Sequence, residues 1–178
     1  MYRFSASSFT RRQAIALLGT LATASFAGCT NNTSPTPESK EAKKPLVLTT
    51  FTVIQDMAAN IAGDFCDVQS ITKAGAEIHD YEPTPEDLKL AQKANLILNN
   101  GLGLERWFER FVADSAAERV DLSQGVTPMN ISEGEYAGEA NPHAWMSPAN
   151  GQIYVDNIVK GLSALVPDHA DDFAKNGE

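Results

Sequence analysis

From Leu46 onward, short apolar runs alternate with stretches in which apolar residues recur at helical spacing. Continuous apolar and β-branched runs of this length are typical of buried strands and occur at 46–51 and 96–98. The more polar segments 68–72 and 119–122 predict two further strands. The stretches between them predict amphipathic helices, and the last helix is expected over 153–165, before Pro167. Strands that alternate with helices predict an α/β fold with an open, mostly parallel sheet flanked by helices.

Two segments between these strands carry further helix signals. The Thr-Pro-Glu-Asp run at 84–87 combines a capping residue, a proline and two acids, so it predicts a helix that begins at Pro85. Apolar residues over 104–112, including Trp107 and Phe108, predict a helix that packs one face against the sheet. Residues 125–147 lack periodicity and are expected to form a loop.

The first 28 residues differ from the rest of the chain. All 23 acidic residues follow Gly28, whereas Arg11 and Arg12 precede a short run of apolar and small residues over 14–27. The run is too short to cross a bilayer, and this order predicts a secretory signal peptide over 1–28. Arg11 and Arg12 resemble a twin-arginine export signal, although Ala14 stands where Phe is common, so ordinary secretion remains the alternative.

The signal ends at a candidate lipid anchor. The run Phe-Ala-Gly-Cys at 26–29 resembles the lipobox of bacterial lipoproteins, in which the cysteine carries the lipid, so Cys29 is the expected attachment point. Residues 29–44 contain no large apolar side chain after Cys29 and are expected to be a flexible spacer. The protein is therefore expected on the outer face of the cytoplasmic membrane or in the periplasm. An incidental cysteine after an ordinary signal peptide is the alternative.

Composition excludes two broad classes. The formal net charge of −9 argues against a nucleic-acid binder, which needs a basic face to displace phosphate counterions. Two cysteines are too few for a disulfide scaffold. With 178 residues, the chain is long enough for one domain with a substantial core.

Two of the three histidines lie in loops between an expected strand and a helix. His79 and His143 are 64 positions apart, and His169 is expected at the surface. Open α/β sheets bind ligands at the carboxyl ends of their strands, so both imidazoles meet if both loops lie at that edge. Imidazole is a good ligand for first-row transition metals. On spacing alone, two unrelated loop histidines remain the alternative.

The residues around these histidines resemble a known family. GAEIHDYEPTP at 75–85, ILNNGLGLERWFERF at 97–111 and NPHAWMSP at 141–148 resemble motifs of the metal-binding lipoproteins that deliver manganese, zinc or iron to ABC importers. Some members of this family were described as adhesins. The resemblance implies two α/β lobes joined by a long helix, with the metal between the lobes and His79 and His143 as ligands from the first. It also implies the membrane permease and ATPase subunits of an importer as partners.

The resemblance also sets the expected domain boundaries. Residues 45–166 correspond to the N-terminal metal-binding lobe, and 167–178 to the start of the interlobe helix. The second lobe, which supplies two further ligands in the family, is expected to be absent. The motif NPHAWMSP resembles the manganese branch of the family, and residues 125–140 lack the histidines that zinc members often carry between the two motifs. Both features favour Mn²⁺ as the transported ion, with Zn²⁺ and Fe²⁺ as alternatives.

The expected function is therefore capture of a divalent metal for uptake by an importer, without catalysis. A surface-anchored interaction or adhesion lipoprotein that transports no metal is one alternative. A metal-dependent hydrolase is a weaker one, because the sequence has no His-Glu-x-x-His spacing.

Overall fold

A four-stranded parallel sheet forms the centre of the protein. The structure is a computed structural model that describes residues 43–112 and 115–178; Arg11, Arg12 and Cys29 lie outside the described residues. The strands are β1 (Leu46–Thr49), β2 (Asp67–Ser70), β3 (Leu96–Asn99) and β4 (Glu118–Asp121). Their order is β2-β1-β3-β4, and every neighbouring pair is parallel. The expected α/β fold is confirmed.

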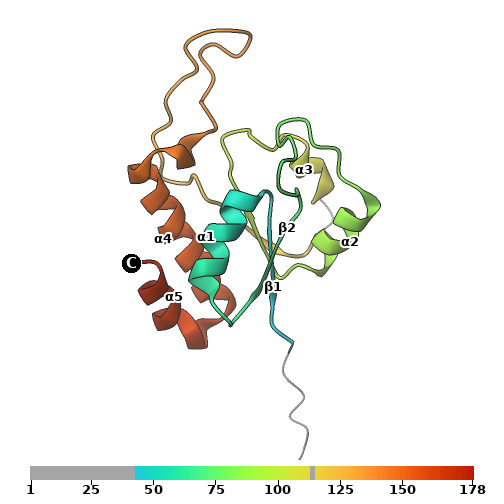
Figure 1. The fold of residues 1–178 in the computed structure, drawn as a ribbon, viewed down its shortest axis with the longest axis vertical. Helices are drawn as coiled ribbons and strands as arrows, with labels where there is room; N and C mark the ends of the chain where they lie inside the picture. Colours follow the sequence, from blue (N-terminus) through green and yellow to red (C-terminus); the bar gives the residue numbers. More distant parts are fainter. Residues whose placement is uncertain (1–42, 113–114) are drawn as a thin grey trace, which may run out of the picture. The chain divides into compact units, whose positions relative to one another are not determined.

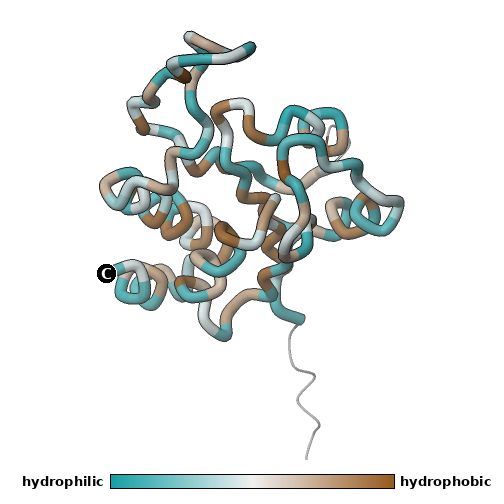
Figure 2. The backbone as a smooth tube through the Cα atoms, turned by 45° about the horizontal axis from the view of Figure 1, so that its top comes forward, coloured by the Kyte–Doolittle hydropathy of each residue, from teal (hydrophilic) through white to brown (hydrophobic). Residues whose placement is uncertain are grey.

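Helices cover both faces of this sheet (Figure 1). On one face lie α1 (Thr52–Ala62), α4 (Pro148–Leu165) and α5 (Ala170–Asn176); on the other lie α2 (Pro85–Lys93) and α3 (Phe108–Phe111). Successive strand residues face opposite sides, so Leu96 and Leu98 join the first core and Ile97 joins the second. Figure 2 shows the hydrophobic stretches along the strands and the inner sides of the helices, with hydrophilic segments along the outer loops.

Local sequence signals account for the helix ends that were predicted. Thr84 caps α2: its hydroxyl accepts from the Asp87 backbone N–H at 3.3 Å, while the Asp87 carboxylate accepts from the Thr84 N–H at 2.8 Å. Burial raises the pKa of Asp87, but hydrogen bonds from Thr84 and Tyr81 outweigh it and leave that pKa lowered. At the end of α1, the φ of +53° at Gly63 favours glycine. The predicted start of α2 at Pro85 is confirmed, and α1 lies in the expected helical stretch between the first two strands.

The predicted helix over 104–112 is wrong in extent. In this segment the structure is helical only over Phe108–Phe111, and residues 102–107 form turns. Gly101, Leu102 and Gly103 have positive φ values of 78°, 53° and 75°, which no right-handed helix accommodates. The apolar residues before Phe108 are buried by this irregular segment, so their burial did not require helical geometry.

The loop over 125–147 contains two short ordered pieces. Asn130 and Ala140 form an isolated antiparallel bridge, and Ala144–Met146 is the 3₁₀ helix η1. Arg106 holds the outer part of the loop, because its guanidinium lies 2.6 Å from a carboxylate oxygen of Glu139. A second 3₁₀ helix, η2 (Pro167–His169), joins α4 to α5. Within the described residues, no helix combines the length and apolar character needed to cross a membrane.

Candidate metal-binding site

The two loop histidines meet above the carboxyl edge of the sheet. His79 follows β2 and His143 follows β4, which are the two edge strands of the sheet. Nevertheless, their Nε2 atoms lie 3.3 Å apart, with ring centroids separated by 5.2 Å. Both side chains are exposed to solvent. The structure thus brings the two sequence-predicted residues together across the whole width of the sheet.

Asn141 determines which nitrogen of His143 carries a proton. The Asn141 Oδ1 atom accepts from the backbone N–H of His143 at 3.0 Å and lies 2.9 Å from Nδ1 of the same residue. A backbone N–H can only donate, so the shared atom is an oxygen and Nδ1 must donate to it as well. In the neutral ring, Nε2 therefore keeps its lone pair free. This lone pair faces His79, and a metal ion requires such a nitrogen.

The separation of the two nitrogens suits a single ion. Two nitrogens that each bind a tetrahedral zinc at ~2.0–2.1 Å lie about 3.3–3.4 Å apart. The observed distance between the Nε2 atoms of His79 and His143 is 3.3 Å. Burial lowers the pKa of His143, and the neighbouring His79 lowers it further, although Glu77 opposes the shift. The electrostatic environment therefore favours the neutral imidazole, which is the form that binds metal.

Within the described residues, other ionisable side chains do not complete the site. Glu77 accepts a hydrogen bond from the His79 backbone N–H at 3.1 Å, so it orders the loop. Among residues 43–112 and 115–178, no group of three or more His, Cys, Asp or Glu side chains is arranged to hold an ion. His169 lies elsewhere: it is half-buried rather than exposed, stacks on Phe65 at 3.7 Å and pairs with Asp172. The geometry offers two nitrogen ligands and leaves the rest of the coordination sphere open.

Beneath the histidines lies a cluster that the sequence did not reveal. The buried polar cluster consists of Thr50, Asn100, Glu105 and Tyr154, each at most 6% exposed. The Glu105 carboxylate accepts from the Thr50 hydroxyl at 2.6 Å and from the Asn100 backbone N–H at 2.7 Å. The Asn100 amide donates to the Pro142 carbonyl at 2.9 Å and its oxygen accepts from the Tyr154 hydroxyl at 2.7 Å. The cluster therefore connects the sheet to the residue before His143.

Burial disfavours the charged forms of the two acidic groups in this cluster, Glu105 and Tyr154. Burial raises the pKa of Glu105, and the hydrogen bonds from Thr50 and the Asn100 backbone offset only part of that rise. Burial and the nearby Glu105 also raise the pKa of Tyr154, which stays a neutral donor. One sequence signal was available: Asn100 directly follows an apolar strand, and Glu105 stands among Leu104, Trp107 and other apolar residues. A polar side chain in such surroundings is expected to have a specific partner.

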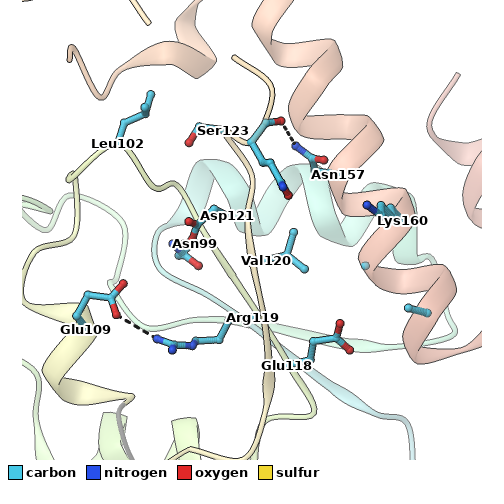
Figure 3. Close-up of a pocket in the computed structure, with 13 residues that line it drawn as sticks. Asn99, Leu102, Glu109, Glu118, Arg119, Val120, Asp121, Ser123, Asn157 and Lys160 are labelled. Carbon is cyan, nitrogen blue, oxygen red and sulfur yellow. Dashed lines mark hydrogen bonds and ion pairs between the residues drawn. The ribbon is translucent and has the colours of Figure 1, made fainter. Parts of the chain in front are cut away.

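A larger cavity lies beside the edge strand β4, away from the histidines. It has a volume of about 890 Å³ and is lined mainly by β4 and the facing side of α4 (Figure 3). Three of its polar side chains are already paired: Arg119 pairs with Glu109 at 3.2 Å, and the Asn157 amide donates to the Leu122 and Gln124 carbonyls. A second cavity, of about 410 Å³, contains both His79 and His143. Of these two cavities in the described part of the chain, the second is the one that pairs metal-ligating nitrogens.

Comparison with known proteins assigns the chain to a family. Residues 47–178 match the family model described as "Zinc-uptake complex component A periplasmic". The chain is similar to the "Iron-binding protein YfeA" of Yersinia pestis, with 54% identity over 83% of this chain and 46% of the relative. It is also similar to the "Manganese ABC transporter substrate-binding lipoprotein PsaA" of Streptococcus pneumoniae, with 38% identity over 83% of this chain and 49% of the relative.

A solved structure shares this fold. The Mn-bound periplasmic metal binding protein from Candidatus Liberibacter asiaticus matches with a TM-score of 0.70 and 38% identity, over 75% of this chain and 50% of that one. The chain spans about half the length of the curated relatives it matches. The motifs around His79 and His143, the sheet order and these similarities agree, and the chain belongs to the ZnuA family of metal-binding proteins.

Proposed function

We propose that this chain captures a divalent first-row metal ion as the substrate-binding component of an ABC importer, with His79 and His143 as ligands. One observation carries the proposal: two exposed imidazoles from opposite edges of the sheet place their Nε2 atoms 3.3 Å apart. The names of the relatives, which include a manganese ABC transporter substrate-binding lipoprotein, support the importer role. The partners would then be the importer's permease and ATPase subunits.

Two neutral imidazoles alone hold an ion weakly. They contribute no negative charge, and water fills the remaining coordination positions. The further length of the relatives offers room for additional ligands, so tight binding is expected only when such residues complete the sphere. For the 178-residue chain we expect Zn²⁺ binding that depends on both histidines, and no submicromolar binding of Mn²⁺.

Mn²⁺ is our leading substrate. The segment 125–140 contains no histidine that would add nitrogen ligands beside the pair, one relative is named a manganese ABC transporter lipoprotein and one solved structure is Mn-bound. Fe²⁺ is the second candidate, because the relative at 54% identity is named an iron-binding protein. The family model's own description names zinc, which binds such nitrogen sites more tightly by intrinsic affinity.

Titration calorimetry on the full chain tests the ligand assignment. His79→Ala and His143→Ala should each weaken Zn²⁺ binding at least tenfold, equivalent to about 1.4 kcal/mol. His169→Ala is the matched control, because His169 lies apart from the pair and binds Asp172. Its Zn²⁺ affinity should equal that of the wild type. Equal affinity in all four proteins would show that the pair does not bind the ion.

Acid should weaken binding by the same chemistry. An imidazole binds metal only when neutral, and its ordinary pKa is about 6.5. Because the pKa of His143 is lowered, this ring stays neutral to a lower pH than an ordinary histidine. Zn²⁺ affinity should therefore fall between pH 7 and pH 5, and His143→Ala should change that profile. An affinity that is independent of pH in this range would argue against imidazole ligands.

We further propose that the protein is exported and lipid-anchored at Cys29, with Arg11 and Arg12 in the export signal. The relatives named as lipoproteins support this placement. In cells, Cys29→Ala should move the protein from the membrane fraction to the soluble fraction. Cys66→Ala is the control, since Cys66 is buried and its pKa is raised by burial. A Cys29→Ala protein that stays membrane-bound would contradict the anchor.

A further inference from the structure

One segment of the chain contacts both histidine loops without carrying either histidine. The segment is the β3–α3 bracket, residues 100–107. At one end, the Asn100 side-chain amide donates to the Pro142 carbonyl at 2.9 Å; at the other, the Trp107 Nε1–H donates to the Ile78 carbonyl at 2.8 Å. Each acceptor is the carbonyl of the peptide bond that immediately precedes a histidine.

We propose that the β3–α3 bracket positions the two imidazoles, with Asn100 and Trp107 as positioning residues for metal capture. The inference rests on the proposed function, because it concerns the same site. Fixing the peptide plane before a residue limits where its side chain can point, since it restricts rotation about the adjoining backbone bonds. Both planes are held by one short segment, so the spacing of His79 and His143 follows from the shape of that segment.

The bracket is suited to this role because its shape is tightly constrained. Gly101, Leu102 and Gly103 adopt positive φ in succession, and a non-glycine residue in that region is strained. A side chain at Gly101 would place its Cβ 2.7 Å from the Ser123 hydroxyl oxygen. The Glu105 carboxylate, which also accepts from the Thr50 hydroxyl, ties the bracket to the end of β1.

Both donors are also held from behind. The Tyr154 hydroxyl, on α4, donates to the Asn100 side-chain oxygen at 2.7 Å, which orients the amide toward Pro142. The Trp107 ring lies 5.2 Å from Tyr81 and 5.5 Å from Phe108, between centroids, in tilted and edge-to-face contacts. Each hydrogen bond to a histidine loop therefore comes from a side chain that a neighbouring residue orients, Asn100 through a hydrogen bond and Trp107 through ring contacts.

Trp107→Phe tests the bracket with little damage to the core. The substitution removes the Nε1–H but keeps an aromatic ring against Tyr81 and Phe108. Zn²⁺ affinity of the full chain should fall about tenfold, the lower end of the range for residues that orient metal ligands. Bound Cu²⁺, the tightest-binding ion of the first-row series, should show a shifted visible absorption band at saturation, because the two nitrogens are less constrained.

Asn157→Ala is the matched control. Asn157 also donates its amide to two backbone carbonyls, at 2.8 and 2.9 Å, but those belong to Leu122 and Gln124 and not to a histidine loop. This variant should lose stability while its Zn²⁺ affinity and Cu²⁺ spectrum match the wild type. Asn100→Ala, where it folds, should reproduce the effect of Trp107→Phe on both metal readouts.

The outcomes separate this proposal from the one before it. If His79→Ala and His143→Ala abolish Zn²⁺ binding but Trp107→Phe binds like the wild type with an unchanged Cu²⁺ band, the bracket does not position the histidines. The proposed function then still stands. If neither histidine variant affects binding, the metal site itself is absent and both proposals fail. If Zn²⁺ affinity falls equally in Trp107→Phe and Asn157→Ala, the loss reflects general destabilisation, and the positioning role of the bracket is wrong.

Discussion

The histidine pair and the buried polar cluster lie one above the other, yet they are built in opposite ways. His79 and His143 are exposed and make few contacts, while Asn100 and Tyr154 are fully buried and every polar atom of the cluster has a partner. An unpaired polar group is costly only where water cannot reach it. The metal-binding imidazoles can therefore lack partners at the surface, whereas the buried polar groups that support them need a hydrogen bond for every polar atom.

The contrast between the exposed pair and the buried cluster predicts its largest effect for Asn100→Ala, on the free energy of unfolding. Asn100→Ala removes the partners of the Tyr154 hydroxyl and the Pro142 carbonyl in a site without water access. At about 1–3 kcal/mol for each buried group left unpaired, the free energy of unfolding should fall by roughly 3 kcal/mol in urea denaturation. Asn157→Ala, at a half-buried position, should lose about 1 kcal/mol. Equal losses would mean that burial does not distinguish the two amides.

A smaller effect is expected from the charge of Glu105. Its pKa in the folded protein is raised above the ordinary 4.5 by burial, so a fall in pH protonates the folded state before the unfolded chain. Relative to Glu105→Gln, the wild type should therefore gain free energy of unfolding as the pH falls from the raised value toward 4.5. Urea denaturation of both proteins between pH 7 and pH 4.5 measures this difference. A difference that stays constant, or moves the other way, would show that the carboxylate is not penalised by burial.

The smallest effect should come from the exposed pair. His79→Ala and His143→Ala remove imidazoles that water already solvates, so the free energy of unfolding should change by no more than about 0.5 kcal/mol without metal. Thermal or urea denaturation in the presence of a chelator measures it. A loss of more than about 1.5 kcal/mol in either variant would contradict the contrast between the exposed histidine pair and the buried polar cluster.

Much of the fold was predictable because its signals are local. The Thr84 cap and the glycine after α1 determine helix ends through atoms a few residues away, and the apolar runs of the strands need only a sheet to bury them. The segment over 104–107 was predicted wrongly, as helix, for the opposite reason. Its apolar residues resemble a helix face, but its Glu105 carboxylate accepts a hydrogen bond from Thr50, which directly follows β1 and is 55 positions away in the chain.

The site shows the same division. The loops of His79 and His143 could be placed at one edge of the sheet, because that follows from a parallel topology. The separation of 3.3 Å could not be predicted, since it depends on contacts such as that of Trp107 with the Ile78 carbonyl. No spacing rule along the chain encodes a hydrogen bond between residues 29 positions apart.

The sheet order gives the histidine pair a mechanical consequence. β2 and β4 are the outermost strands, and outer strands are the parts of a sheet that open most readily. An ion bound by both His79 and His143 would link the loops that follow β2 and β4. Either outer strand could then separate from the sheet only after its histidine had dissociated from the ion. Metal binding should then slow amide exchange most at the two margins of the sheet, far more than at its already protected centre. Amide exchange in β2 and β4 would thus report whether the site is occupied, although the ion contacts neither strand.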